Sequence, residues 1–403
     1  MNPFAEPAVV IQAMPRWDGA YASTSFTIAK ELSKDRLVFY VDHPFTWKDM
    51  LNKSAEAQLE RRRALWNRQT YHEKPFKDLP NLVIISPKPV PSINFLPPGS
   101  VYNQCRAYNN RLVWNYINMT LDRFAVSEFV YLNSFDPVYS MVDTTKEVLL
   151  KIYHSVDYMP GERYIARHGV QAEELFAKQA DIVIGTSEPI TKRLRKWNRR
   201  AMTIENAADF SMFDEFKGEV PEDMASIPYP RVLYLGNIGL RMDYTMLEDI
   251  VSENEGVNFV FAGPENSREF KGEALKKYKN VYFLGRKDYE KVPAYIKGAD
   301  LCIIPFIRNE YTRHIYPLKI NEYLSMGKPV LVSNFADFSS FKDVVYLYES
   351  KEEFQEKMQE ALTVDGEDKI SERKAVAASN TWEKRMLTWR KLLREEVQIR
   401  VNR

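Results

Sequence analysis

Short apolar runs, rich in β-branched residues, recur along the chain and alternate with longer mixed stretches. In the first half these runs are 8–13, 37–41, 82–85, 129–132, 148–153 and 182–184, and in the second half 232–235, 257–262, 281–284, 301–304, 330–332 and 345–347. Continuous apolar runs of this kind are typical of strands in a parallel sheet that is covered on both faces. The stretches between them, such as 171–180 and 319–326, carry helix-forming residues. The alternation predicts an α/β chain with two doubly wound, Rossmann-like domains.

The join between the two domains is expected at residues 213–230. Their sequence, FDEFKGEVPEDMASIPYP, is acidic, has three prolines after a glycine and lacks a sustained apolar period, which favours a linker. This predicts an N-terminal domain over 1–212 and a C-terminal domain over 231–380. In the last segment, 381–403, five apolar side chains share one helical face: Trp382, Met386, Trp389, Leu393 and Val397. That helix should pack on the body of the molecule, with a partner protein as the alternative.

Composition and charge exclude several classes of function. The chain has 403 residues, of which 56 are basic and 55 acidic. Its net charge of +1 is too small to draw it to nucleic acid. No basic region followed by an apolar stretch marks a secretory signal, and no run approaches the roughly 18 apolar residues of a membrane-spanning helix. Two distant cysteines, Cys105 and Cys302, suit a reducing compartment. We expect a cytoplasmic protein, with contact to the inner face of a membrane left open.

Residues 301–333, LCIIPFIRNEYTRHIYPLKINEYLSMGKPVLVS, carry the most chemical information. A strand should end at Pro305, a polar loop should follow, and a helix should run from Pro317 to Gly327, its C-cap. The helix start then lies at the carboxyl end of a strand, where backbone N–H groups and the helix dipole favour an anion. Four potential cations are expected near this start: Arg308, Arg313, His314 and Lys319. The arrangement suits a pyrophosphate.

The segment PLKINEYLSMGKPVLVS resembles the signature PLKxxEYxAxGKPVV of GT-B-type glycosyltransferases related to the large retaining family 4, or group 1. The stretches GNIGLRMDYTML, NFVFAGP and NVYFLGRKDYEKVPAYIKGADLCIIPF are similar to the same family in order and spacing. Farther upstream, ADIVIGTSEPI and IENAADFSMF resemble the end of the N-terminal domain, although Ala207 stands where the family usually has glycine. The resemblance implies GT-B architecture, with the two domains facing across a cleft and the terminal helix 381–403 crossing back onto the first.

The resemblance also implies a binding site for a nucleotide-sugar donor in the C-terminal domain. Glu322 matches the second carboxylate of the family's Glu-x7-Glu pair and should hold the donor ribose, whereas His314 stands where the first is expected. A surface ion pair of Lys319 with Glu322 is the alternative explanation of their spacing. Residues assigned to the donor are Gly236, Gly239, Arg241, Gly263, Arg286, Arg313, Lys319 and Glu322. Lys319 and Arg241 are the candidates for the diphosphate.

The N-terminal domain is expected to bind the acceptor. YHSVD, residues 153–157, follows a predicted strand and resembles the family's His-containing strand end, which makes His154 and Asp157 candidate catalytic residues together with His314. A structural role is the alternative for His154. The first loop holds Trp17, Asp18 and Gly19 but no GxGxxG fingerprint, so a dinucleotide is not expected. The polar stretch 47–77, with Arg61, Arg62 and Arg63, is expected to form a mobile flap near the acceptor.

No DxD tripeptide follows a predicted strand, and no group of His, Asp and Glu has metal-ligand spacing, so neither a metal nor another cofactor is expected. The six basic residues within 191–200 favour either a solvated helix end or contact with anionic lipid.

The sequence therefore predicts a glycosyltransferase, retaining by analogy and metal-independent, that moves a sugar from a nucleotide sugar to a glycan, lipid-linked or small-molecule acceptor in surface polysaccharide or glycoconjugate synthesis. A nucleotide-sugar epimerase of the same fold and a non-catalytic sugar-nucleotide-binding scaffold remain alternatives.

Overall fold

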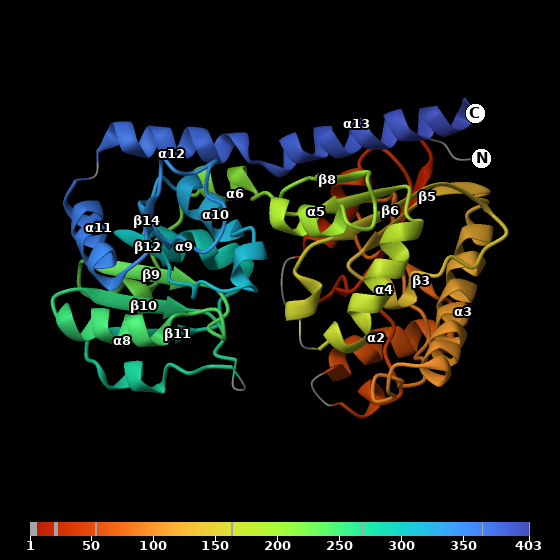
Figure 1. Ribbon diagram of the computed structural model, residues 1–403, viewed down its shortest axis with the longest axis horizontal. Coiled ribbons are helices and arrows are strands. Elements are labelled where there is room, and N and C mark those ends of the chain that lie inside the picture. Colours follow the sequence, from red (N-terminus) through yellow and green to blue (C-terminus); the bar gives the residue numbers. More distant parts are fainter. Residues whose placement is uncertain are drawn as a thin grey trace. The chain divides into compact units, whose positions relative to one another are not determined.

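The computed structural model describes residues 6–19, 23–52, 55–162, 164–266, 269–364 and 366–402 (Figure 1). The chain forms two compact units. Unit 1 consists of Met1–Glu205 and Met386–Arg403, and unit 2 of Asn206–Arg385. Residues 20–22 of the first loop lie outside the described residues. Each unit is built around one sheet whose strands are mostly parallel.

The sheet of unit 1 has the strand order β3-β4-β2-β1-β5-β6-β7-β8, and only β3 is antiparallel to its neighbour. Its strands are β1 (Ala8–Ala13), β2 (Val38–Val41), β3 (His72–Glu73), β4 (Leu82–Ile85), β5 (Glu128–Ser134), β6 (Glu147–Ser155), β7 (Ile182–Gly185) and β8 (Ala201–Thr203). Its first five helices are α1 (Thr24–Leu32), α2 (Glu56–Asn67), α3 (Ser100–Arg123), α4 (Ala166–Gln179) and α5 (Glu188–Leu194). The chain winds from β1 to β2 and later returns to β5 on the other side, so the strand order reverses between β1 and β5.

The sheet of unit 2 has the order β11-β10-β9-β12-β13-β14 and reverses in the same way between β9 and β12. Its strands are β9 (Arg231–Leu235), β10 (Asn258–Ala262), β11 (Val281–Gly285), β12 (Leu301–Ile304), β13 (Val330–Ser333) and β14 (Tyr346–Tyr348). Its helices are α6 (Phe210–Asp214), α7 (Glu222–Ala225), α8 (Tyr244–Glu253), α9 (Val292–Lys297), α10 (Leu318–Ser325), α11 (Lys351–Thr363) and α12 (Glu367–Ser379). Short 3₁₀ helices occur at Asp49–Leu51, Pro137–Tyr139, Met159–Gly161, Glu273–Lys277, Tyr289–Lys291 and Thr312–His314.

The apolar runs of the sequence form the strands that were predicted from them, and the prediction of two doubly wound α/β units is confirmed. Most of these strands are buried along their length, as expected for sheets covered on both faces. Strands β3 and β8 were not predicted, because they have two and three residues and no apolar period. Burial in β12 raises the pKa of the Cys302 thiol to about 12.

The stretch 213–230 belongs to unit 2 in the structure, whereas the sequence predicted a linker there. Helices α6 and α7 lie in it, and their apolar side chains Phe213 and Met224 are 1% and 0% exposed within the core of unit 2. The division between the units falls instead at Glu205 and Asn206. Scattered apolar positions in short helices leave no period, which is why the stretch resembled a linker.

The last helix, α13 (Trp382–Val401), contributes its residues from Met386 onward to unit 1. Met386, Trp389 and Leu393 are its buried side chains, on the face that the sequence predicted. Its Trp389 packs edge-on against the ring of His154 at the end of β6, with ring centres 5.3 Å apart. On its polar side, Arg390 pairs with Asp35, so the helix is held by charge as well as by apolar packing.

The expectation of a mobile flap over 47–77 was wrong for its central part. Residues 56–67 form α2, and Arg62 on this helix is 1% exposed. Its guanidinium bonds Asp18 at 2.8 and 2.9 Å and Asp42 at 2.6 Å. A buried arginine shared by two carboxylates fixes the helix on the sheet, because separating the charges would leave them uncompensated in the interior.

Candidate functional site

The polar loop after β9, residues 236–243, lies where the strand order of unit 2 reverses. The loops that follow the two neighbouring strands hold it. The N–H of Ile238 donates to the carbonyl oxygen of Pro264 after β10 at 3.0 Å, and the N–H of Asp243 donates to that of Pro305 after β12 at 2.9 Å. The carboxyl ends of strands at such a reversal are where ligands bind in open α/β sheets.

Two glycines let the backbone pass closely at this point. Gly236 has φ +143°, and a Cβ there would lie 2.2 Å from Cε of Lys319. A Cβ on Gly263 would lie 1.8 Å from the carbonyl oxygen of Gly236. Side chains at either position would displace the loop or the lysine, so the glycines are needed for the lysine to reach the loop.

Lys319 comes from the first turn of α10, which follows Pro317 at its N-cap position. Its half-buried ammonium lies 5.7 Å from the ring centre of Tyr234 and 5.9 Å from that of Phe306. No described residue forms a hydrogen bond or ion pair with it. Burial, reinforced by the charge of Arg241 and opposed by Glu322, lowers the pKa of Lys319 to about 8. An anion at this place would relieve the desolvated charge.

Glu322 lies one helical turn after Lys319 and is also half-buried. Tyr289, in the 3₁₀ helix after β11, donates its hydroxyl to Oε1 of Glu322 at 3.4 Å. Burial raises the pKa of this carboxyl, while Lys319 and the Tyr289 hydroxyl oppose the shift. The carboxylate therefore belongs to the same electrostatic cluster as Lys319 and differs from an exposed surface pair.

Arg241 is the second cation of the loop. Its Nη2 and Nε donate to the hydroxyl oxygen of Tyr311 at 2.6 and 3.2 Å, which orients the guanidinium. The N–H of Ile307 donates to the carbonyl oxygen of Arg241 at 2.8 Å, so backbone and side chain are both held by the loop after β12. Two neighbouring cations of like charge, with one acidic group beside them, favour a ligand with more than one negative charge.

Other predicted donor residues lie in different surroundings. His314 is 5% exposed and its Nδ1 is 2.7 Å from the carbonyl oxygen of Glu310, a contact that holds the loop. Arg313 is exposed and pairs with the carboxylate of Glu310 at 2.8 Å, and Arg308 pairs with Glu349 at 3.1 Å. Arg286 is exposed at the end of β11. Gly239 lies in the loop of Arg241. Their roles toward a donor stay predictions.

In unit 1, His154 lies near the end of β6 and is buried. It is 1% exposed, its Nδ1 lies 3.0 Å from Oγ of Ser134, and its ring packs edge-on against Trp389 at 5.3 Å. Burial lowers the pKa of His154 to about 3, so the imidazole is neutral. Asp157 is half-buried after β6. The catalytic roles of both remain predictions, and His154 has the surroundings of a packed core residue.

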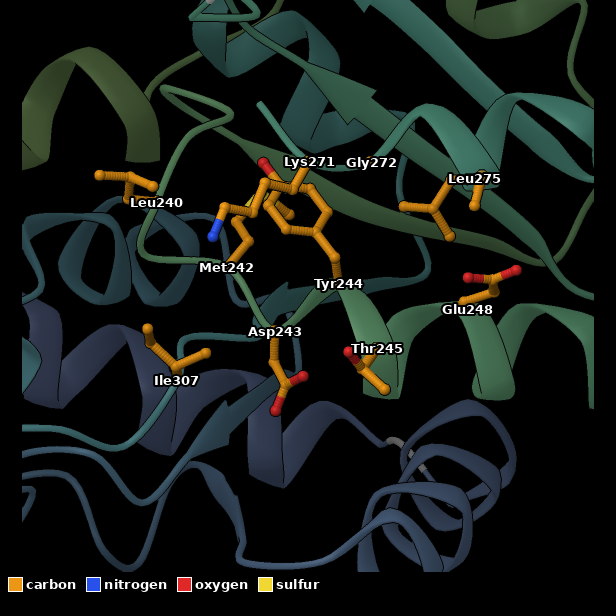
Figure 2. A pocket seen from close by; sticks show the side chains of 11 residues that line it. Leu240, Met242, Asp243, Tyr244, Thr245, Glu248, Lys271, Gly272, Leu275 and Ile307 are labelled. Carbon is orange, nitrogen blue, oxygen red and sulfur yellow. The ribbon is translucent and has the colours of Figure 1, made fainter. Parts of the chain in front are cut away.

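A hollow of about 300 Å³ lies beside the loop 236–243. Figure 2 shows the side chains that line it. Leu240, Met242, Tyr244 and Ile307 line part of it, whereas Lys319 and Glu322 do not. The hollow is therefore separate from the cluster at the strand reversal.

Two residues of the cluster escaped the sequence analysis. Tyr289 and Tyr311 were not singled out; Tyr311 lies in the loop after β12, and Tyr289 begins the 3₁₀ helix after β11. The rule that polar residues after a strand meet at one edge would have found Tyr311. Tyr289 is placed beside Glu322 only by tertiary structure.

Across the described ranges, no group of three or more His, Cys, Asp and Glu side chains could hold a metal. Within the same ranges, no helix is long and apolar enough to cross a membrane.

Comparisons with known proteins fit this geometry. Residues 230–363 match the family model described as Glycosyl transferases group 1. This range includes Arg241, Lys319 and Glu322 at the strand reversal of unit 2. Over these residues the chain resembles the group 1 glycosyltransferases. A curated relative in Bacillus subtilis (strain 168), named as a candidate teichuronic acid biosynthesis glycosyltransferase, TuaH, is 25% identical over 223 residues. The match covers 52% of this chain and 56% of that protein, so the chain spans about half the length of the curated relative.

Two solved structures are similar to the chain along most of its length. Sucrose-phosphate synthase from Thermosynechococcus elongatus superposes with a TM-score of 0.66 at 15% identity, covering 96% of this chain and 98% of the other. A trehalose-6-phosphate protein from E. coli, bound with UDP-2-fluoro glucose, gives 0.67 at 10% identity with 96% and 98% coverage. The fold of the chain is GT-B, as its sequence predicted.

Proposed function

We propose that this chain is a glycosyltransferase that takes a sugar from a nucleotide-sugar donor held at the strand reversal of unit 2. The observation that carries the proposal is the desolvated Lys319 ammonium, which lies against Gly236 without a hydrogen-bonding partner among the described residues. Lys319 and Arg241 would bind the donor diphosphate, and Glu322 would accept hydrogen bonds from the ribose hydroxyls. The group 1 match over the same residues supports this assignment.

The reaction needs the sugar–diphosphate bond to break. As it breaks, negative charge grows on the departing diphosphate oxygen, and cations already fixed there stabilise that charge more than they stabilise the intact donor. We propose that Lys319 and Arg241 supply this stabilisation without a divalent metal. Retention of the anomeric configuration is proposed from the resemblance to the retaining family.

For the acceptor we propose a glycan or lipid-linked acceptor of surface polysaccharide synthesis, bound by unit 1. The similarity to a protein named for teichuronic acid biosynthesis supports this class. Contact of the basic segment 191–200 with the inner face of a membrane also stays a proposal. Within that segment, Arg193 pairs with buried Glu173, Arg195 with Glu188, and Arg200 with Glu396, so only part of its charge is available to lipid.

A panel of UDP-, GDP-, ADP- and TDP-sugars tests the proposal. The purified chain is screened for thermal stabilisation, since a ligand that binds only the native state raises the melting temperature. Donors that stabilise it are incubated with glycan and lipid-linked acceptors, and release of the nucleoside diphosphate is followed with and without excess EDTA. Stabilisation, acceptor-dependent release and full activity in EDTA are expected.

Each contrary outcome has its own meaning. The absence of stabilisation by any sugar nucleotide would refute the donor site. Conversion of the donor without acceptor would indicate an epimerase, and binding without turnover a scaffold. Activity lost in EDTA and restored by Mg²⁺ or Mn²⁺ would refute the metal-free mechanism.

A further inference from the structure

Two loops of unit 1 lie side by side at the carboxyl ends of their strands. The loop 42–52 follows β2, and the loop 86–99 follows β4, which is the neighbour of β2 in the sheet. The N–H of Trp47 in the first loop donates to the carbonyl oxygen of Val90 in the second at 3.0 Å. Helix α3 begins directly after the second loop, so the two loops and the start of α3 form one surface.

Four large apolar side chains are exposed on this surface, and we call them the apolar tip. Trp47, Leu51, Phe95 and Val101 are 62%, 88%, 72% and 63% exposed. All seven tryptophans of the chain lie in the described ranges, and Trp47 is the exposed one among them. Single exposed apolar residues are ordinary, whereas several on adjoining loops are typical of a surface that binds a partner.

The chain around the apolar tip is basic. Residues 79–121 contain no acidic residue and three basic ones, which are Lys88, Arg106 and Arg111. Lys48 has an exposed side chain, and its N–H donates to Oγ of Ser92 at 3.1 Å. Exposed Arg167, in α4, donates from Nη1 to the carbonyl oxygen of Phe95 at 3.4 Å. Each of the two loops therefore has an exposed cation beside it.

The acidic residues of the first loop turn away from this surface. Asp42 is buried and pairs with Arg62. Oδ2 of Asp49 accepts hydrogen bonds from the N–H and the hydroxyl of Thr46 at 2.8 and 2.9 Å, so this carboxylate is held against its own loop. The surface thus combines exposed apolar side chains with exposed positive charge.

We propose that unit 1 docks onto an anionic lipid surface through the apolar tip, with Lys48 and Arg167 against the lipid head groups. Apolar side chains gain free energy by entering the boundary between head groups and acyl chains, and cations are attracted to anionic lipid. Tryptophan suits this boundary because its ring is apolar and carries a polar N–H. The segment 191–200 is a different surface, and it exposes no tryptophan.

The apolar tip lies at the carboxyl edge of the sheet of unit 1, the edge at which open α/β sheets bind ligands. Docking there would bring a lipid-linked acceptor to the edge at which unit 1 can bind it. This consequence rests on the proposed function, whereas the docking itself does not.

The alternative occupant of the apolar tip is a second copy of the chain. Two tips that met in a dimer would place Lys48 and Arg167 near the same residues of the other copy, and like charges oppose such a contact. An anionic surface has the opposite charge, so charge complementarity favours lipid.

The test measures binding of the full chain to vesicles without donor or acceptor, so its outcome does not depend on the transferase function. Vesicles of phosphatidylcholine with phosphatidylglycerol are compared with pure phosphatidylcholine by co-sedimentation. The chain should bind the anionic vesicles more tightly, and added NaCl should weaken this binding because salt screens the charges. Brominated lipid should quench the tryptophan fluorescence of the wild type, and Trp47→Phe should bind but lose this quenching.

Substitutions in the apolar tip should weaken the binding most. Trp47→Ser combined with Phe95→Ser should lower the partition coefficient about tenfold or more, because two apolar side chains no longer leave water. Lys48→Ser should lower it about fivefold on anionic vesicles and leave binding to pure phosphatidylcholine unchanged. Leu51→Ser should also bind more weakly. Its matched control is Leu387→Ser on α13, where the side chain is 66% exposed, and this variant should bind like the wild type.

Several outcomes would overturn the docking proposal. Equal binding of the wild type and the Trp47→Ser, Phe95→Ser variant is one. A loss in Lys192→Ser with Lys196→Ser, without a loss in the tip variants, would assign the lipid contact to the segment 191–200. A wild-type dimer that ignores vesicles and dissociates in Trp47→Ser would assign the tip to a second copy. Failure of every sugar nucleotide to bind would overturn the proposed function and leave the docking result standing.

Discussion

Unit 1 and unit 2 share a winding scheme but differ in the chemistry at the point of reversal. In unit 2, glycines bring the backbone close to Lys319, and its charge is desolvated without a hydrogen-bonding partner among the described residues. In unit 1, the guanidinium of Arg62 is paired with the carboxylates of Asp18 and Asp42. Side chains that bind each other serve stability, whereas a cation left uncompensated costs stability and is available to a ligand.

The largest effect on stability is expected when Arg62 of unit 1 is replaced. Arg62→Met should lower the free energy of unfolding by about 3–5 kcal/mol, because Asp42 is left buried and unpaired. Arg63→Met is the matched control on the next residue. Its side chain is 38% exposed and pairs with exposed Glu56, so its loss should cost about 1 kcal/mol or less. Urea unfolding measures both losses, and equal losses would contradict a stabilising role for the buried pairing of Arg62 with Asp18 and Asp42.

A smaller effect is expected for the carboxylate of unit 2. Glu322→Ala should weaken binding of the donor by about 1.5–3 kcal/mol, the range for a hydrogen bond to a charged group. Titration calorimetry with the sugar nucleotide found in the panel gives the affinity. Glu372→Ala, exposed on α12, is the control that should leave the affinity unchanged. Equal affinities of wild type and Glu322→Ala would remove Glu322 from the site.

The smallest effect concerns the protonation of Lys319. Because burial lowers its pKa to about 8, the ammonium loses its proton as the pH rises through that value, and the diphosphate then loses a cation. Donor affinity should therefore fall by about tenfold between pH 8.5 and 9.5. Lys319→Met should bind more weakly and lack this dependence while keeping its stability. An unchanged pH dependence in Lys319→Met would assign the effect to another group.

Much of the predicted donor site of unit 2 could be inferred from local sequence. Apolar runs define the strands, and the PLK segment places Lys319 and Glu322 one turn apart on a helix that begins after Pro317. His314 and Arg313 were assigned to the same site by the same reasoning, but sequence distance does not say which way a side chain turns. The structure directs Arg313 to Glu310 and buries His314 against a backbone carbonyl.

The sequence by itself determined the order of strands and helices, because burial on both faces of a parallel sheet requires continuous apolar runs that local composition reveals. It also determined which segment is similar to group 1 glycosyltransferases. Tertiary structure alone decided that Arg62 joins Asp18 and Asp42, that Tyr289 meets Glu322, and that His43 meets Asp136. These partners lie dozens of residues apart, and only strand order and register bring them within hydrogen-bonding distance.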